Sequence, residues 1–112
     1  MITDALGNEL KIGDLVMYAS GKQYYNLVLN VGVIKKFYRQ WTNDEEAEPN
    51  FAQIFTIRGK KLMTNPGGIA SRSLKGIIKC PQEIAVKYDF AINLYNEYLN
   101  NKLHDEDEEN NQ

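Results

Sequence analysis

The run from Leu27 to Tyr38 is the longest strand candidate and most restricts the folds that are open to this chain, because apolar residues recur at every second position from Leu27 to Val33. Side chains of a strand point alternately to its two faces. One face of this run carries four apolar residues: Leu27, Leu29, Val31 and Val33. Gly32 lies inside the run and predicts a bulge, a sharp bend or a close backbone approach. A bend of this kind lets a small closed sheet turn a corner.

Shorter strand patterns surround this run. The N-terminal residues predict a hairpin over Thr3–Leu10, with Gly7-Asn8 in its turn. Further strands are predicted at residues 15–19, 51–58 and 76–80, with Leu62-Met63 as a short additional candidate. Turn-forming residues separate them, and the strongest break is Asn65-Pro66-Gly67-Gly68. The spacing favours five or six strands in a mostly antiparallel arrangement.

The C-terminal part of the chain changes to helical spacing. Apolar residues recur three and four positions apart from Ile84 to Leu103, and Pro81 suits the first turn of a helix. A helix over Gln82–Leu103 would be about 33 Å long at 1.5 Å per residue, which exceeds the width of a small barrel. Its end is expected either to fray or to present an apolar face to a partner chain. The candidate partner face consists of Tyr95, Tyr98 and Leu99.

The formal net charge of −2 conceals an uneven distribution of charge. Two acidic runs, residues 44–48 and 105–109, stand apart from a body that contains 13 basic and 6 acidic residues. A cationic body attracts anionic partners, although lysines that keep strand edges soluble are a simpler explanation. Residues 104–112 contain no apolar side chain and are predicted to form a disordered acidic tail.

Residue types that support catalysis or metal binding are sparse. His104, the only histidine, borders the acidic tail, and Cys80, the only cysteine, is expected to be a small buried hydrophobe. No pair of Cys and His residues has the spacing of a zinc site. We therefore expect no enzyme, no catalytic residue, no metal and no cofactor. No long apolar stretch and no signal peptide are visible, so a cytoplasmic protein without membrane contact is expected.

The segment Lys35–Trp41 is the most suggestive stretch for binding, because cations alternate there with Phe37, Tyr38 and the only tryptophan. Aromatic rings that stack on bases, together with cations that neutralise phosphate, are typical of single-strand binders. The same residue types dominate protein contacts, and a third interpretation has Phe37 and Trp41 covering the core. The candidate binding patch adds later basic residues: Lys35, Lys36, Tyr38, Arg39, Trp41, Arg58, Lys60, Lys61 and Arg72.

The segment Asn65–Ser73 is rich in glycine and ends beside Arg72. Backbone N–H groups with an arginine as charged anchor are one way to bind phosphate. The segment matches neither the P-loop nor the dinucleotide-binding fingerprint, so a plain loop is the favoured interpretation.

Short motifs in the first 80 residues resemble those of small SH3-like and KOW-like barrels. The resemblance rests on Asp4-x-x-Gly7-Asn8-x-Leu10-Lys11-x-Gly13-Asp14-x-Val16 and on Gly32-Val33-Ile34-Lys35. In those families a Gly-Asp turn precedes the first barrel strand, and a Gly-Val-Ile run marks a later one. The chain also resembles short uncharacterised proteins of large tailed bacteriophages, through Arg72-Ser73 and Ile77-Ile78-Lys79.

The expected fold is mainly β with one α-helix. Residues 1–80 would form an SH3-like antiparallel β-barrel, residues 81–103 an amphipathic helix packed on it within the same domain, and residues 104–112 the disordered tail. The expected function is a non-enzymatic binding protein, namely a phage accessory or host-interaction factor that acts by protein–protein contact in the host cytoplasm. Its partner would be a host protein or a second copy of the chain. The protein itself would be a monomer or a homodimer through the C-terminal helix. The alternative is a nucleic-acid or nucleotide-binding barrel that uses the candidate binding patch.

Overall fold

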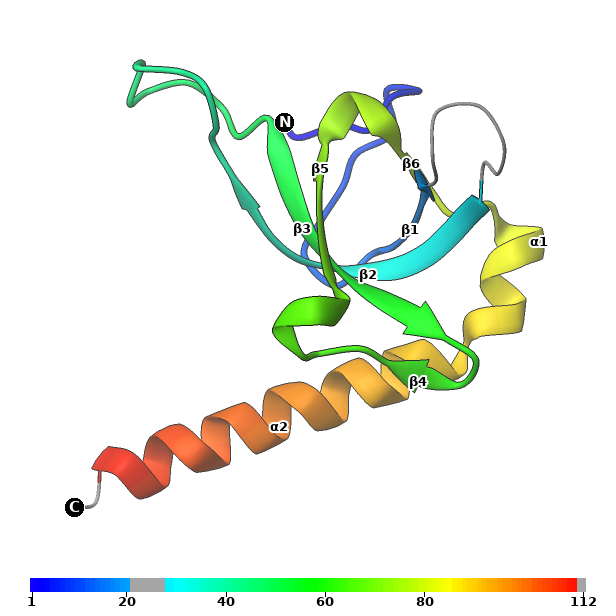
Figure 1. Ribbon diagram of the computed structural model, residues 1–112, viewed down its shortest axis with the longest axis vertical. Coiled ribbons are helices and arrows are strands. Elements are labelled where there is room, and N and C mark those ends of the chain that lie inside the picture. The colour runs from blue at the N-terminus through cyan, green and yellow to red at the C-terminus, as the bar shows by residue number, and fades with distance from the viewer. Residues whose placement is uncertain (21–27, 111–112) are drawn as a thin grey trace.

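The computed structural model describes residues 1–20 and 28–110, the last seven of these by their backbone alone. Figure 1 shows a curved sheet with a long helix beneath it. The strands are β1 (Leu15–Ser20), β2 (Val28–Tyr38), β3 (Phe51–Arg58), β4 (Lys61–Leu62), β5 (Ile69–Ser73) and β6 (Ile77–Lys79). The helical segments are η1 (Pro66–Gly68), η2 (Leu74–Gly76), α1 (Gln82–Ala85), η3 (Val86–Tyr88) and α2 (Phe90–Asn110).

The six strands form one antiparallel sheet in the order β4-β3-β2-β1-β6, with β5 also paired to β3. The predicted mainly β fold with a C-terminal helix is therefore confirmed. The sheet is not closed, because no ladder joins β5 to β6 within the part of the chain that the structure describes. The predicted barrel is accordingly not confirmed.

Gly32 lies in the middle strand of three, where it pairs with Val16 of β1 and with Thr56 of β3. A Cβ atom at this position would lie 2.4 Å from the Ile54 side chain and 2.6 Å from the Phe55 carbonyl oxygen. The close backbone approach predicted for Gly32 is thus confirmed. The β-bulge lies further along the strand, where the register shifts between Ile34 and Lys36.

The sheet buries apolar side chains on both faces. The first core lies on the side of the N-terminal residues and η2, and it contains Leu10, Val16, Tyr18, Ile34, Ala52, Ile54, Leu74 and Ile77. The helix-side core lies between the sheet and the C-terminal helices, and it contains Met17, Val31, Val33, Ile57 and Ala91. Alternation along β1 sends Val16 and Met17 to opposite cores. Both faces of the central strands are therefore covered, one by the N-terminal residues and η2 and the other by the C-terminal helices.

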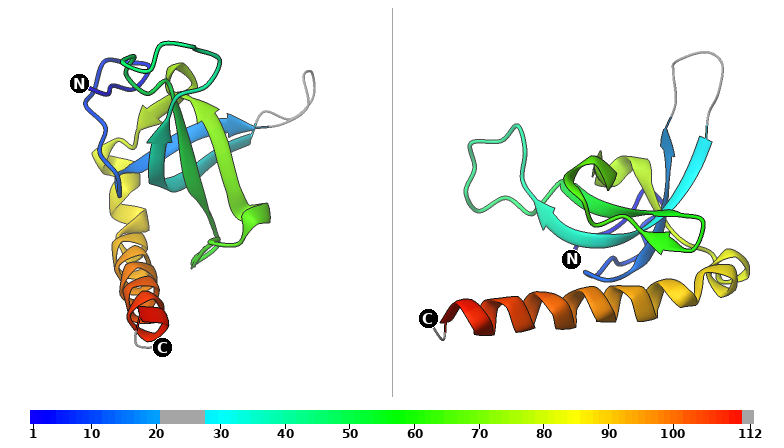
Figure 2. Two further views of the ribbon diagram at one scale, coloured as in Figure 1. Left: turned by 90° about the vertical axis from the view of Figure 1, so that its left-hand side faces the viewer. Right: turned by 60° about the horizontal axis from the view of Figure 1, so that its bottom comes forward.

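The C-terminal helix differs from the single continuous helix predicted over Gln82–Leu103. α1 ends at Ala85, η3 follows, and α2 begins after Asp89. The break redirects the chain so that α2 runs along the sheet (Figure 2). Tyr88 and Phe90, on either side of the break, both pack against the helix-side core, with ring centroids 6.0 Å apart. Packing on the sheet therefore overrides the helical periodicity of the sequence.

α2 continues to Asn110, seven residues beyond the predicted end at Leu103, and residues 111–112 lie outside the described residues. The disorder predicted for residues 104–112 concerns behaviour in solution and stays a prediction. Within residues 1–20 and 28–110, no helix combines the length and the apolar character that a bilayer span requires.

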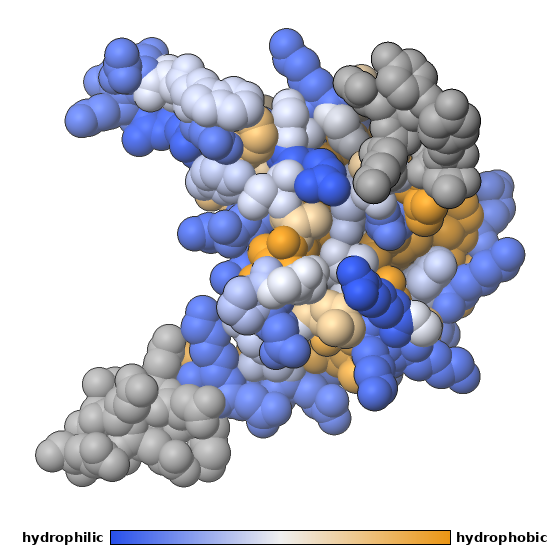
Figure 3. All heavy atoms as spheres, in the orientation of Figure 1, coloured by the Kyte–Doolittle hydropathy of each residue, from blue (hydrophilic) through white to orange (hydrophobic). Residues whose placement is uncertain are grey.

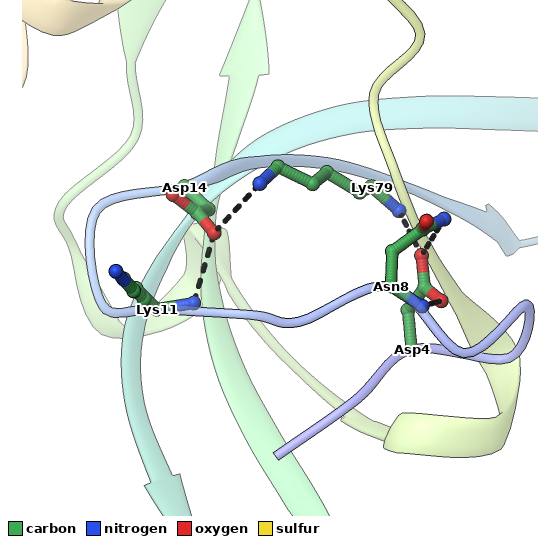
Figure 4. A network of polar contacts seen from close by, with 5 residues as sticks. All are labelled: Asp4, Asn8, Lys11, Asp14 and Lys79. Atoms are coloured by element: carbon green, nitrogen blue, oxygen red, sulfur yellow. Dashed lines mark hydrogen bonds and ion pairs between the residues drawn. The ribbon is translucent and has the colours of Figure 1, made fainter. Parts of the chain in front are cut away.

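A polar network ties the N-terminal turn to β6 (Figure 4). The buried Asp4 carboxylate accepts the backbone N–H groups of Leu6 at 2.9 Å, Asn8 at 2.8 Å and Lys79 at 2.7 Å. Burial raises the pKa of the Asp4 carboxyl, but these donors and the Asn8 side-chain amide outweigh it and hold the pKa below its ordinary value. The network thus holds a negative charge inside the fold, and no cation among the described residues forms an ion pair with it.

The two turns predicted in the first 14 residues are confirmed. Gly7 and Gly13 have φ values of 86° and 93°, which an L-residue with a side chain rarely adopts. Thr3 and Glu9 form a β-bridge across the first turn. In the second turn Asp14 accepts the Lys11 N–H at 2.8 Å. These turns direct the chain into β1.

Candidate functional site

The structure distributes the nine residues of the candidate binding patch over separate places. β3 accounts for this distribution, since its first residue, Phe51, lies beside Trp41 and its last residue is Arg58. The ends of an eight-residue strand lie about 23 Å apart at about 3.3 Å per residue. The nine residues therefore do not form one continuous surface, and each group has its own surroundings.

Trp41 is the most exposed aromatic residue described, with 85% of its surface accessible. Its φ of 61° lies in the left-handed region, which is strained for a residue with a side chain. The surrounding loop is closed at its base, because the Gln40 N–H donates to the Asn50 side chain and the Asn50 amide donates to the Gln40 carbonyl, both at 2.8 Å. The indole also meets the edge of the Phe51 ring, with centroids 5.2 Å apart. The fold therefore fixes an indole that points into solvent.

The exposure of these side chains tests the interpretation in which Phe37 and Trp41 cover the core. Phe37 is half-buried and packs against the first core, so for Phe37 that interpretation is confirmed. Trp41 covers no core, and for this residue the interpretation is wrong. Tyr38 is half-buried, with its ring centroid 5.7 Å from that of Phe51.

The loop that carries Trp41, residues 39–50, is acidic rather than basic. Asp44, Glu45 and Glu46 are all exposed in it, and the loop forms a hydrophilic projection from the body (Figure 3). Arg39 turns back and donates to the Asp44 carbonyl at 2.8 Å. The immediate surroundings of the indole thus carry more negative than positive side chains.

A groove of about 580 Å³ lies beside Trp41. Its walls come from the N-terminus, from the end of the Trp41 loop and from the β5–η2 junction. Ile2 and Leu74 contribute apolar surface, and Glu48 forms an ion pair of 2.7 Å with the N-terminal amine. The sequence offered no signal for this groove, because the three segments are far apart along the chain.

The lysines of the patch lie elsewhere. The bulge in β2 places the Lys35 ammonium 5.7 Å from the centroid of the Phe55 ring, next to α2, while Lys36 is exposed on β2. Lys60 in the β3–β4 turn and Lys61 at the start of β4 line a shallow hollow together with Glu97 of α2. These lysines therefore face the helix side of the molecule.

Arg58 and Arg72 do come together. Both line a cavity of about 500 Å³ near the start of β5, which η1 also borders. The Arg72 guanidinium lies 4.9 Å from the centroid of the Tyr18 ring and donates to the Ser71 carbonyl at 2.8 Å. Tyr18 was missed by the sequence analysis, because it lies in an apolar strand where an aromatic residue is typical of the core.

The three residues of the candidate partner face have different environments. Tyr95 packs against the helix-side core, and the Tyr98 ring meets the Phe55 ring at 4.9 Å between centroids. Leu99 is 37% exposed. Two of the three side chains thus contact their own sheet, and dimerisation through this helix stays a prediction.

Catalytic and metal-binding groupings were not expected from the sequence. Among the residues described by the structure, no three His, Cys, Asp or Glu side chains lie close enough together to hold a metal ion. Cys80 is half-buried against the helix-side core, and burial raises the pKa of its thiol. Cys80 therefore packs as a small hydrophobe, but it is only half-buried where full burial was expected.

The chain matches no curated protein and no solved structure. A family model described as Domain of unknown function (DUF7205) matches residues 2–61, from the first turn to β4. Because this match spans more than half of the 112 residues, the protein belongs to the DUF7205 family.

Proposed function

We propose that this protein is a non-enzymatic binding protein that contacts a partner protein through Trp41 and the groove beside it. The observation that carries the proposal is an 85% exposed indole on a loop whose base is closed by reciprocal hydrogen bonds. Tryptophan is among the residues that contribute most to protein–protein affinity, because it buries a large area at a low cost in conformational entropy. A rigid presentation lowers that cost further.

The surroundings of Trp41 indicate the chemistry of the partner. The groove offers apolar surface from Ile2 and Leu74, and the loop offers the carboxylates of Asp44, Glu45 and Glu46. A complementary surface combines an apolar side chain with basic residues. The same carboxylates repel phosphates, so the nucleic-acid alternative is disfavoured at this part of the patch.

We also infer the type of fold, the class of partner and the cellular location. The resemblance to SH3-like barrels is supported by a curved six-stranded sheet with a core on its concave side, and we infer that the open sheet is a variant of that fold. The resemblance to proteins of large tailed phages supports a host protein as the partner and the host cytoplasm as the location.

The test is affinity capture from host lysate with and without nuclease, followed by direct binding of the captured protein. We expect one dominant partner in both samples and at least tenfold weaker binding by Trp41→Ala. Ile92→Ala is the matched control, because Ile92 is 62% exposed on α2. Capture that disappears with nuclease, or affinity that Trp41→Ala leaves unchanged, contradicts the proposal.

Fluorescence provides an independent readout, since Trp41 is the only tryptophan in the chain. The free protein should emit at the long wavelength of a hydrated indole and be quenched readily by iodide. Partner binding should shift the emission to shorter wavelength and protect it from iodide. An unshifted, fully quenchable emission in the saturated complex would place the contact elsewhere.

A further inference from the structure

The cavity between Arg58 and Arg72 has a charge imbalance that the rest of the fold does not explain. Its lining comes from β1, β2, β3 and β5, with η1 at its border. Among the described residues, the lining contains two arginines and no aspartate or glutamate. Within the described residues the ion pairs are those of the N-terminal amine with Glu48 and of Lys79 with Asp14. Neither arginine is therefore neutralised by a carboxylate in that part of the chain.

Arg72 is held in place by the sheet. Its guanidinium lies over the Tyr18 ring, and one of its N–H groups donates to the Ser71 carbonyl. Tyr18 is itself only 4% exposed and shares a hydrogen bond with the Thr56 hydroxyl. Stacking fixes the plane of a guanidinium while its remaining donors stay available, and this arrangement suits a tetrahedral oxyanion.

Apart from Tyr18 and Ile69, the other lining residues are small or polar. Ser20, Asn30 and Ser71 add hydroxyl and amide groups, and the Asn30 amide donates to the Ser20 hydroxyl. The carboxylate-rich Trp41 loop adjoins the opposite end of β3. An anion in the cavity would thus meet two cations and neutral donors at close range.

The volume of the cavity favours a compact ligand over a polymer. About 500 Å³ lies within the usual range of small-molecule sites. A nucleic-acid strand needs cations that follow its backbone, whereas Lys60 and Lys61 line a different hollow together with Glu97. We propose that this cavity binds the phosphate group of a small phosphorylated molecule, with Arg58 and Arg72 as its charged anchors.

The glycine-rich segment, for which a plain loop was favoured, instead forms η1 and the strand β5. Gly67 and Gly68 line the cavity. A Cβ at Gly68 would lie 2.4 Å from the Met63 Cβ, so packing explains that glycine. Nothing lies within 4 Å of a Cβ at Gly67, so packing does not explain that glycine.

The test is titration of the full chain with inorganic phosphate, ribose 5-phosphate, AMP and adenosine, followed by calorimetry and by amide chemical shifts. The three phosphates should bind and shift amides of the lining residues, while adenosine should not. Equal affinities would identify the phosphate group alone as the ligand. Tighter binding of AMP or of ribose 5-phosphate would identify the source of that phosphate. Absence of binding by all three phosphates would overturn the proposal.

Two variants locate the site. Arg58→Gln and Arg72→Gln should each weaken phosphate binding at least tenfold, and Arg72→Lys should restore only part of it because an ammonium lacks the planar fork. Arg58 is exposed, so Arg58→Gln keeps the test valid even if Arg72→Gln loses stability. Arg39→Gln, beside the acidic loop, is the matched control and should bind as the wild type does.

The outcomes also separate this site from the protein-binding surface. Trp41→Ala should leave phosphate binding unchanged, and Arg58→Gln should leave capture of the partner protein unchanged. Phosphate affinity that survives both arginine variants would overturn the proposal. Binding of a single-stranded oligonucleotide with a steep salt dependence, without binding of AMP, would also overturn it.

Discussion

The carboxylate of Asp4 accepts the backbone N–H of Lys79 at 2.7 Å, and this contact joins the first turn of the chain to its last strand. The same carboxylate satisfies the N–H groups of Leu6 and Asn8. The Ala5 N–H also donates to the Ile77 carbonyl at 2.9 Å, so a buried side chain and a backbone hydrogen bond together hold the N-terminal turn against β6. Removal of the carboxylate should therefore act on the whole sheet rather than on the turn alone.

We expect Asp4→Asn to lower the free energy of unfolding by about 2–3 kcal/mol. The NH2 group of the new asparagine would replace one carboxylate oxygen, so it would face backbone N–H groups that now donate to that oxygen. Urea denaturation of the two proteins measures the difference. Glu9→Gln, at an exposed position of the same turn, is the control and should change stability by less than about 0.5 kcal/mol. Equal losses in both variants would show that Asp4 has no special role.

The lowered pKa of Asp4 predicts a specific dependence of stability on acid. A carboxyl whose pKa is lower in the folded state stabilises the fold above its unfolded pKa, for which the ordinary value is 3.8. This contribution should be lost as the pH falls below about 4 toward the folded pKa. Comparison of wild type with Asp4→Asn between pH 2 and pH 7 isolates it. A stability difference that stays constant over this range would contradict the assignment.

Gly32→Ala should destabilise the fold by about 1–3 kcal/mol, since its new methyl group would overlap the Ile54 side chain and the Phe55 carbonyl. Gly76→Ala is the matched control, because nothing lies within 4 Å of a Cβ there. Thermal unfolding followed by circular dichroism compares the two. Similar melting temperatures for both variants would rule out the close approach at Gly32.

Tyr98→Ala should cost about 2 kcal/mol of stability, because the Tyr98 ring covers the fully buried Phe55. Its neighbour Leu99 is exposed, so Leu99→Ala should cost less than about 0.5 kcal/mol. Chemical denaturation measures both values. If Leu99→Ala is the more damaging change, and light scattering shows that it also lowers the molecular mass, a dimer through this helix is indicated.

Cys80 should react slowly with iodoacetamide at pH 8. Burial raises the pKa of its thiol, so the reactive thiolate is a smaller fraction than in an exposed cysteine. We expect alkylation several times slower in the folded chain than in urea, with mass spectrometry to count the modified molecules. Equal rates in the two conditions would place Cys80 in an exposed position.

Local signals account for the parts of the fold that the sequence predicts well. Gly7 and Gly13 need a positive φ that their own turns impose, and Val31 and Val33 share the buried face that period two assigns to them. Leu29, predicted on the same face, is exposed, and Leu27 lies outside the described residues. Gly32 likewise stands out within a single strand. Each of these predictions depends on residues within a few positions of one another.

Contacts between distant segments account for the rest. The break in the helix at Asp89 follows from the packing of Tyr88 and Phe90 on the sheet, and no Pro or Gly marks it. The candidate binding patch joined residues that are close in sequence or alike in charge. The cavity instead joins Tyr18 to Arg72, whose proximity depends on the pairing of strands across the sheet.

The helix-side core has a consequence for the family to which the chain belongs. The family match ends at residue 61, before β6, which pairs with β1, and before α2, which covers Val31 and Val33. A chain that ended there would leave β1 without a neighbour on one side and an apolar sheet face in water. The shared segment is therefore an incomplete folding unit. In this chain the residues after 61 supply the second neighbour of β1 and the apolar cover of the sheet.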